Sequence, residues 1–110
     1  MADGEHQEKT ALYSVGQLVL HRLFDYRGVI FDVDPVFAGT DEWYEANSKT
    51  RSPKDKPWYH VLVHDTAATT YVSERNLEPD DSGEPVRHPL LDQVLKRLEG
   101  GSYQSREQAN

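Results

Sequence analysis

The chain contains no cysteine, and this absence excludes several kinds of site. Without thiols there is no disulfide framework, no thiolate metal site and no cysteine nucleophile. Apolar runs are only a few residues long, so we expect no membrane-spanning segment and no membrane partner. The first ten residues lack the apolar stretch of a signal peptide. Together these features predict a cytoplasmic protein.

Positive charge is also scarce in this sequence. There are 12 Lys and Arg against 19 Asp and Glu, which gives a formal net charge of −7 at pH 7. A protein that binds phosphate groups needs a basic face, and the overall field of this chain repels polyanions. Non-specific binding of nucleic acid is therefore disfavoured unless the basic residues gather at one place.

Two residue pairs are candidates for catalysis or metal binding. Asp32 and Asp34 are two positions apart on an expected strand, about 6–7 Å from each other, a separation that suits an acid/base pair. A solvated strand end before Pro35 explains the same two residues. His60 and His64 lie about 13 Å apart on an extended strand, which is too far for one metal ion. We therefore expect no metal site and no catalytic residue.

The glycines and serines give no further sign of an active site. Gly28, Gly39 and Gly83 are isolated, so there is no glycine-rich loop that could cradle a phosphate. Neither Ser73 nor Ser82 lies in the pattern of a nucleophile elbow. We expect a protein that is not an enzyme and that holds no cofactor.

The apolar pattern predicts several short strands and little helix. Alternating apolar positions or residues of high β-propensity occur at residues 15–22, 29–34, 58–64 and 69–73. Short strands joined by polar turns are typical of a mainly β protein, and we expect a small, partly open β-barrel.

Two local signals supplement the strand pattern. Thr40 is a good N-cap for a short inserted helix that ends at Asn47. Residues 25–28 are expected to form the turn after the first strand, with Gly28 free to take a positive φ angle. On the second strand, three residues are expected to face the core: Val29, Phe31 and Val33.

Polar segments bound the expected domain. Residues 1–12 are expected to be a disordered tail, residues 13–89 the β-barrel domain, and residues 100–110 a flexible tail. Residues 90–99 predict an amphipathic C-terminal helix that Gly100 ends. This helix either covers the open end of the barrel or packs against another subunit or partner. Its apolar residues share one stripe: Leu90, Leu91, Val94, Leu95 and Leu98.

Much of the positive charge gathers in one loop. Basic groups beside an aromatic ring are what single-strand or groove binding of nucleic acid uses. The alternative is a solvated loop whose tryptophan anchors the return of the chain to the sheet, and the residues alone leave both interpretations open. The candidate nucleic-acid-binding residues are Lys49, Arg51, Lys54, Lys56 and Trp58.

The stretch HRLFDYRGVIFDVDP, residues 21–35, contains a second candidate surface. One interpretation is architectural, with Arg22 and Arg27 paired to nearby carboxylates such as Asp32 or Asp34 so that two strands are locked together. Exposed ion pairs contribute only about 0–1 kcal/mol, which is a weak reason to place several charges there. The other interpretation is a partner-binding surface made by Arg22, Tyr26, Arg27 and Asp32.

The same stretch resembles the signature of a known family. Residues 21–35 are similar to the pattern HRxFxYRGVIFDVDP of the bacterial heat-shock protein HspQ family, also called the YccV-like hemimethylated-DNA-binding domain. The similarity spans about residues 14 to 89, and the segment from Leu90 onward lies outside it. Further matches follow in order: TDEWY at 40–44, KDKPWYH at 54–60, YVSERNL at 71–77 and DSGEPVRHP at 81–89.

The resemblance implies a fold and two functions. The implied protein is a small SH3-like β-barrel that is cytoplasmic, non-enzymatic and assembled as a homotrimer. One implied function is the binding of hemimethylated DNA. The other is to promote turnover of denatured proteins, including the replication initiator DnaA, by assisting the ATP-dependent protease Lon. A protein–protein adaptor without physiological DNA binding is the alternative, because a net charge of −7 is poorly suited to a duplex.

Overall fold

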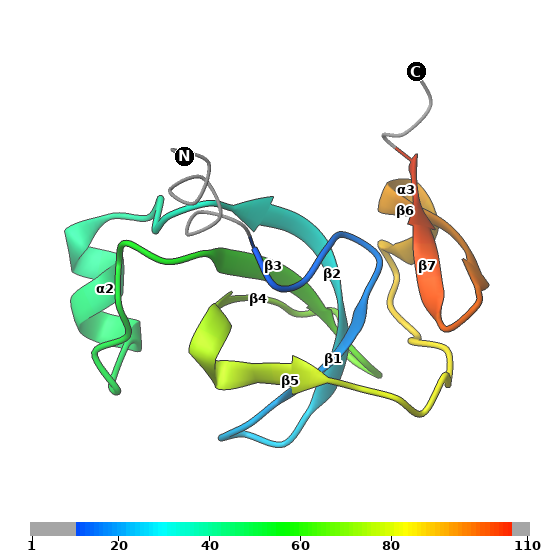
Figure 1. Cartoon of the computed structure of the whole chain (residues 1–110), viewed down its shortest axis with the longest axis horizontal. Coiled ribbons are helices and arrows are strands. Elements are labelled where there is room, and N and C mark those ends of the chain that lie inside the picture. Colours follow the sequence, from blue (N-terminus) through cyan, green and yellow to red (C-terminus); the bar gives the residue numbers. More distant parts are fainter. Residues whose placement is uncertain (1–10, 107–110) are drawn as a thin grey trace, which may run out of the picture.

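The computed structural model describes residues 11–106, which form an antiparallel sheet and a separate hairpin (Figure 1). The order across the five-stranded sheet is β4-β3-β2-β1-β5, so β4 and β5 are its edges. The sheet curves but does not close into a barrel, because these two edge strands do not pair with each other. The strands are β1 (Leu18–His21), β2 (Arg27–Asp34), β3 (Trp58–Val63), β4 (Thr69–Ser73) and β5 (Leu77–Pro79).

The predicted strands and the inserted helix are confirmed. Strands β1, β3 and β4 fall within the predicted ranges, and β2 begins slightly earlier than expected, at Arg27. Helix α2 (Asp41–Asn47) starts after Thr40, whose Oγ1 accepts the N–H of Trp43 at 3.0 Å. A 3-10 turn, η1 (Glu74–Asn76), leads from β4 into β5. In the described part of the chain, no helix is long and apolar enough to cross a membrane.

Strand β2 does not keep the simple alternation that its sequence predicts. Its register with β3 shifts between Ile30 and Asp32, which makes Phe31 a bulge. Val29 and Ile30 are both fully buried, on opposite faces, whereas Phe31 and Val33 are only half-buried. The prediction of one continuous core face through Val29, Phe31 and Val33 is therefore wrong.

The buried apolar residues form two clusters, one on each face of the sheet. Neighbouring residues of β1 divide between the clusters, as do neighbouring residues of β2, because successive side chains of a strand point to opposite faces. One cluster joins the sheet to the C-terminal segment: Leu18, Val29, Leu62, Val86, Leu95 and Tyr103. The other lies on the opposite face of the sheet: Val19, Ile30, Tyr59, Val61, Val72 and Leu77.

The expected C-terminal helix over residues 90–99 is wrong. Only one helical turn forms, α3 (Leu91–Val94), and a hairpin of β6 (Leu95–Glu99) and β7 (Ser102–Ser105) follows it. Gly100 and Gly101 have φ angles of 66° and 89°, the conformation of a two-residue hairpin turn. A Gly-Gly pair suits the end of a helix equally well in sequence, and the hairpin prevails because it buries Leu95 completely.

The expected tails are described only in part. Residues 102–105 form β7, so the prediction of a flexible tail from residue 100 is wrong for that strand. Residues 1–10 and 107–110 lie outside the described residues.

The hairpin docks on the sheet where the Tyr103 N–H donates to the Gly16 carbonyl at 2.7 Å. The Tyr103 hydroxyl accepts the Val86 N–H at 3.0 Å.

Gly28 is required for a reason other than the one its sequence context suggests. It lies within β2 and is not among the residues with a positive φ angle, whereas Asp25 in the preceding turn has a φ of 60°. A Cβ at Gly28 would lie 2.5 Å from Val61 Cγ1 and 2.6 Å from the Leu62 carbonyl oxygen. Glycine is therefore needed for the close approach of β3.

We expect Gly28→Ala to lower the free energy of unfolding by about 1–3 kcal/mol, because the added methyl overpacks the sheet. Urea denaturation measures this change. Gly28→Asn separates the two possible reasons for glycine at this position, a positive φ angle and the close approach of β3. Asparagine tolerates a positive φ angle but is larger than alanine. The structure predicts that Asn is the more destabilising of the two, and an Asn variant near wild-type stability would contradict it.

Candidate binding surface

The turn between β1 and β2 holds two apolar side chains at the surface. His21 lies at its base, and the imidazole Nδ1 accepts the backbone N–H groups of Leu23 at 3.1 Å and Phe24 at 3.0 Å. The His21 ring also stacks on Phe24 with 4.6 Å between centroids. Leu23 and Phe24 nevertheless remain 54% and 71% exposed. The turn thus presents apolar groups in a fixed arrangement.

Burial lowers the pKa of His21 from its ordinary value. The neutral ring keeps a lone pair on Nδ1, which is what the two backbone N–H groups of the turn require. The sequence pattern alone predicted no role for His21. One sequence signal could have indicated this role. It is a histidine that stands two and three residues before the backbone N–H groups of an expected turn, where its ring can accept both hydrogen bonds.

The four residues predicted as a partner surface have different neighbours. The Tyr26 hydroxyl lies 2.7 Å from Thr70 Oγ1 of β4. Arg22 is exposed, and its backbone N–H donates to the Asn76 carbonyl. Asp32 is exposed and accepts the backbone N–H of Val33. The structure therefore does not gather Arg22, Tyr26, Arg27 and Asp32 around one partner.

Arg27 has an architectural role. Its Nε donates to Asp80 Oδ2 at 2.7 Å, and its terminal nitrogens donate to the carbonyls of Glu84 at 2.6 Å and Pro85 at 3.4 Å. The side chains of Arg27 and Asp80 are only 22% and 6% exposed. The expected pairing of Arg27 with Asp32 or Asp34 is therefore wrong, because Arg27 instead fastens β2 to the segment that follows β5.

Asp80 is held in its charged form by these contacts. Its burial raises the pKa, but hydrogen bonds from Arg27 and Ser82 outweigh that effect, and the pKa of Asp80 lies below its ordinary value. Loss of Arg27 would leave this carboxylate buried without its main partner, which is strongly unfavourable.

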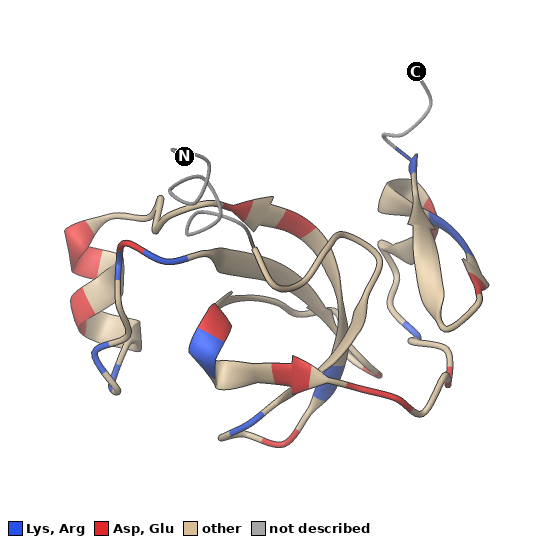
Figure 2. Ribbon diagram, viewed as in Figure 1, with Lys and Arg blue, Asp and Glu red and all other residues tan. Residues whose placement is uncertain are grey.

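Two of the predicted nucleic-acid-binding residues contact acidic groups of α2. Arg51 pairs with Glu45 at 2.9 Å, and Lys54 pairs with Asp41 at 3.3 Å. The Lys54 ammonium also lies 4.4 Å from the centroid of Tyr44. Acidic and basic segments are interspersed in this region (Figure 2). Part of the positive charge of the loop is therefore compensated within the protein.

Lys49 and Lys56 differ from the other basic residues of the loop. Within residues 11–106, neither has an ion-pair partner, and both side chains are exposed. Any phosphate contact of the loop would depend mainly on these two lysines.

The prediction that Trp58 contacts nucleic acid is not supported by its position. Its side chain is 2% exposed, and the indole N–H donates to the Pro53 carbonyl at 2.9 Å. Trp58 packs with four other rings that attach the α2 insertion to the sheet, so it anchors the loop as the alternative interpretation held. These rings are Phe37, Trp43, Tyr44 and Tyr71.

Asp32, Asp34 and His60 converge at one end of β2 and β3. One ligand atom from each lies within 4.8 Å of the others. Asp34 Oδ2 accepts the Tyr71 hydroxyl at 2.6 Å and lies 3.1 Å from His60 Nε2. Burial and the bond to Asp34 raise the pKa of Tyr71 to about 12. These ligand types suit a divalent cation, but the existing contacts already give Asp34 a structural role that joins three strands.

This group was not predicted from the sequence, because the spacing of His60 and His64 along one strand says nothing of neighbours on the next strand. The cross-strand pairing of Asp32 with His60 brings the residues together. That pairing could be deduced only from the register of β2 with β3, which the bulge alters.

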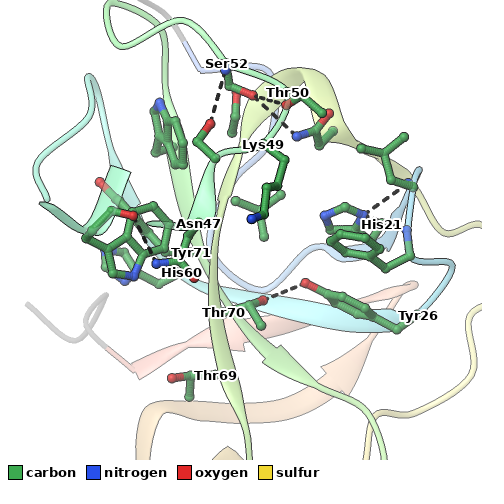
Figure 3. Close-up of a pocket in the computed structure, with 18 residues that line it drawn as sticks. His21, Tyr26, Asn47, Lys49, Thr50, Ser52, His60, Thr69, Thr70 and Tyr71 are labelled. Carbon is green, nitrogen blue, oxygen red and sulfur yellow. Dashed lines mark hydrogen bonds between the residues drawn. The ribbon is translucent and has the colours of Figure 1, made fainter. Parts of the chain in front are cut away.

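A pocket of about 460 Å³ lies between β4, the β1–β2 turn and the loop after α2 (Figure 3). His21, Phe24 and Tyr26 line it from the turn, and Lys49 from the loop. All five residues of β4 contribute to the lining. Figure 3 shows Lys49 between His21 on one side and the pair His60 and Tyr71 on the other. None of the 18 lining residues is Asp or Glu.

The fold and this pocket define a small open-sheet β domain with a preformed surface recess, and no carboxylate of the described residues lines that recess. A family model for the hemimethylated DNA-binding protein YccV like matches residues 11–102. The chain belongs to this YccV-like family, as its resemblance indicated. The match extends beyond residue 89 and includes α3 and β6, so the segment from Leu90 is part of the family pattern.

We expect Arg27→Ala to lower the free energy of unfolding at pH 7 by about 2–3 kcal/mol, because it leaves the buried Asp80 carboxylate without its main partner. The folded-state pKa of Asp80 is depressed, so this stabilisation is present above the ordinary aspartate pKa of about 3.9. It is lost as the pH falls through the lower, folded-state value. The difference between the wild type and the variant should therefore shrink on acidification.

Urea denaturation over a range of pH measures this effect. Arg51→Ala is the matched control, because Arg51 and Glu45 form an ion pair in which both side chains are largely exposed. No clear change in stability is expected from it. An Arg27→Ala variant as stable as Arg51→Ala, or a difference independent of pH, would refute the architectural role of Arg27.

Proposed function

We propose that the protein is a cytoplasmic, non-enzymatic binding module that promotes turnover of denatured proteins, such as the replication initiator DnaA, by assisting the Lon protease. The observation that carries this proposal is that Leu23 and Phe24 are exposed beside the pocket on a turn whose backbone is held in place. Exposed apolar groups next to a recess are a common feature of protein interaction sites. This function requires no positive surface, which agrees with the net charge of −7.

The form of the turn supports a recognition role for these two residues. His21 uses two hydrogen bonds and a stacked ring to hold the backbone of Leu23 and Phe24. A surface that is ordered before binding loses less conformational entropy when a partner arrives. An apolar turn with only an architectural function would gain more by burying its side chains in the protein's own core.

We expect the double substitution Leu23→Ser and Phe24→Ser to reduce the stimulation of Lon severalfold. Two exposed apolar groups at an interface each contribute on the order of 1 kcal/mol or more. The measurement is the rate at which purified Lon degrades a chemically denatured model substrate, with and without the protein. Thermal unfolding should show that the variant keeps its fold, because both side chains are exposed.

Leu12→Ser provides the control, since Leu12 is 72% exposed but does not line the pocket. The control should stimulate Lon like the wild type. Equal stimulation by all three proteins would show that the turn is not the interaction site. If the wild type has no effect on Lon, the proposed function itself is wrong.

Binding of hemimethylated DNA is the second candidate function, and the description of the matching family favours it. Lys49 and Lys56 are the residues best placed for phosphate contacts, because α2 compensates Arg51 and Lys54. The alternative is an adaptor that does not bind DNA under physiological conditions.

We expect the pair Lys49→Glu and Lys56→Glu to abolish any DNA affinity, and Lys54→Glu to reduce it less. Each lost phosphate contact should lower the salt dependence of log K by about 0.9. Anisotropy titrations at several salt concentrations, with hemimethylated, fully methylated and unmethylated duplexes, measure both quantities. Equal and weak binding of the three duplexes at physiological salt would favour the adaptor alternative.

A further inference from the structure

The outer edge of β4 has unpaired backbone groups. Ala68 and Glu74, which flank β4, form backbone hydrogen bonds with Val63 and Pro57 on the β3 side. Because the two sides of a strand alternate in antiparallel pairing, the odd-numbered residues of β4 direct their N–H and C=O groups away from β3. Those residues are Thr69, Tyr71 and Ser73, except that the Ser73 C=O accepts the first hydrogen bond of η1, of which Ser73 is the N-cap. No other strand of the described chain pairs with this edge.

The pocket follows this edge. All five residues of β4 line it, from both faces of the strand, which places the cavity alongside the strand and not over one of its faces. On the far side, Tyr26 of the β1–β2 segment reaches Thr70 through its hydroxyl (Figure 3). The recess therefore lies beside the β4 edge of the open sheet.

Ser73 at the end of β4 has a buried hydroxyl that lacks a partner. Within residues 11–106 its side-chain oxygen has no hydrogen-bond partner, although the residue is only 2% exposed and lines the pocket. Buried hydroxyl groups nearly always find a hydrogen-bond partner, so this one indicates a partner that binding supplies. It is an independent sign that a polar ligand belongs at this edge.

The charge of the lining narrows the chemistry of the ligand. The protein is rich in acidic residues, yet none of those within residues 11–106 lines the pocket, whereas Lys49 extends into it. Lys49 has no carboxylate partner among the described residues. The site therefore suits a ligand that carries negative charge together with apolar groups for contact with Phe24.

We propose that an extended segment of an unfolded protein, with acidic and apolar side chains, binds in this pocket as an added strand on β4. The outward N–H groups of Thr69, Tyr71 and Ser73, with the outward C=O groups of Thr69 and Tyr71, match the backbone of another strand. A nucleic-acid strand has no such row of alternating donors and acceptors. Lys49 pairs with a carboxylate of the segment, and Phe24 contacts an apolar side chain. This inference rests on the proposed function and specifies how the denatured partner is held.

The test uses a fluorescein-labelled peptide in which Glu alternates with Phe, titrated with the full chain and followed by anisotropy. Two derivatives carry backbone N-methyl groups, one on the Glu positions and one on the Phe positions. Strand addition uses only every second N–H of the peptide. We expect one derivative to bind at least about tenfold more weakly and the other to bind nearly as well as the unmodified peptide.

Protein variants test the named contacts. Lys49→Glu should weaken peptide binding about five- to tenfold, while Lys56→Glu, which reverses an exposed charge outside the pocket, should not. Ser73→Ala should weaken binding about three- to tenfold and yet raise the urea midpoint of the free protein, because it removes an unpartnered hydroxyl. A purely structural role for Ser73 could not produce these opposite effects.

The inference is overturned if both N-methylated peptides bind like the parent peptide. It is also overturned if an unlabelled single-stranded oligonucleotide displaces the peptide while Ser73→Ala binds normally, because the pocket would then be a nucleic-acid site. The Lon assay runs in parallel. If the peptides bind as expected but the protein does not stimulate Lon, only the proposed function is wrong. If stimulation depends on Leu23 and Phe24 but the N-methylated peptides do not bind as expected, only the strand addition on β4 is wrong.

Discussion

The structure depends on the position of β2 between two partner strands. Its first residues pair with β1 on one side and with β3 on the other, so a displacement of β2 would break both ladders. Gly28 permits the close approach of β3, and Arg27 fastens the strand to the segment that follows β5. The bulge at Phe31 then changes which side chains of β2 reach the two apolar clusters.

The surface features follow from this arrangement. With β2 at the centre, the order of strands leaves β4 as an edge, and the chain covers that edge with no other strand of the described sheet. The α2 insertion forms one wall of the recess through its aromatic contacts with Trp58 and Tyr71. The β1–β2 turn forms the other wall, and His21 keeps it in place. Natural proteins usually protect an exposed edge, so one that borders a preformed pocket indicates binding.

Features that depend on neighbouring residues could be predicted from the sequence. The strands β1 to β4 and the α2 helix with its Thr40 cap are of this kind, because alternation and capping act over a few positions. The basic loop was also found from its composition. Trp58 was open to two interpretations, a contact with nucleic acid or an anchor of the loop, and its burial agrees with the anchor. The resemblance to the YccV-like family depended on several short motifs in the right order, and the family match confirms it.

Features that depend on contacts between distant residues could not be predicted in this way. Arg27 meets Asp80 rather than the nearby Asp32, because the chain after β5 returns to that end of β2. Leu95 and Leu98 fit a helical stripe, but Gly100 and Gly101 make a hairpin that buries Leu95 against the sheet. The pocket itself combines three separate segments, so no local pattern in the sequence marks it.

Amide hydrogen exchange of the free protein, followed residue by residue by NMR, tests most directly whether the edge of β4 is open. Thr70 and Val72 donate toward β3 in this account, so their amides should exchange slowly, whereas those of Tyr71 and Ser73 should exchange much faster. Such an alternation along one short strand is the predicted result. Equal protection of all four amides would contradict the account, because it would show that another strand, for instance from a second subunit, already occupies the edge.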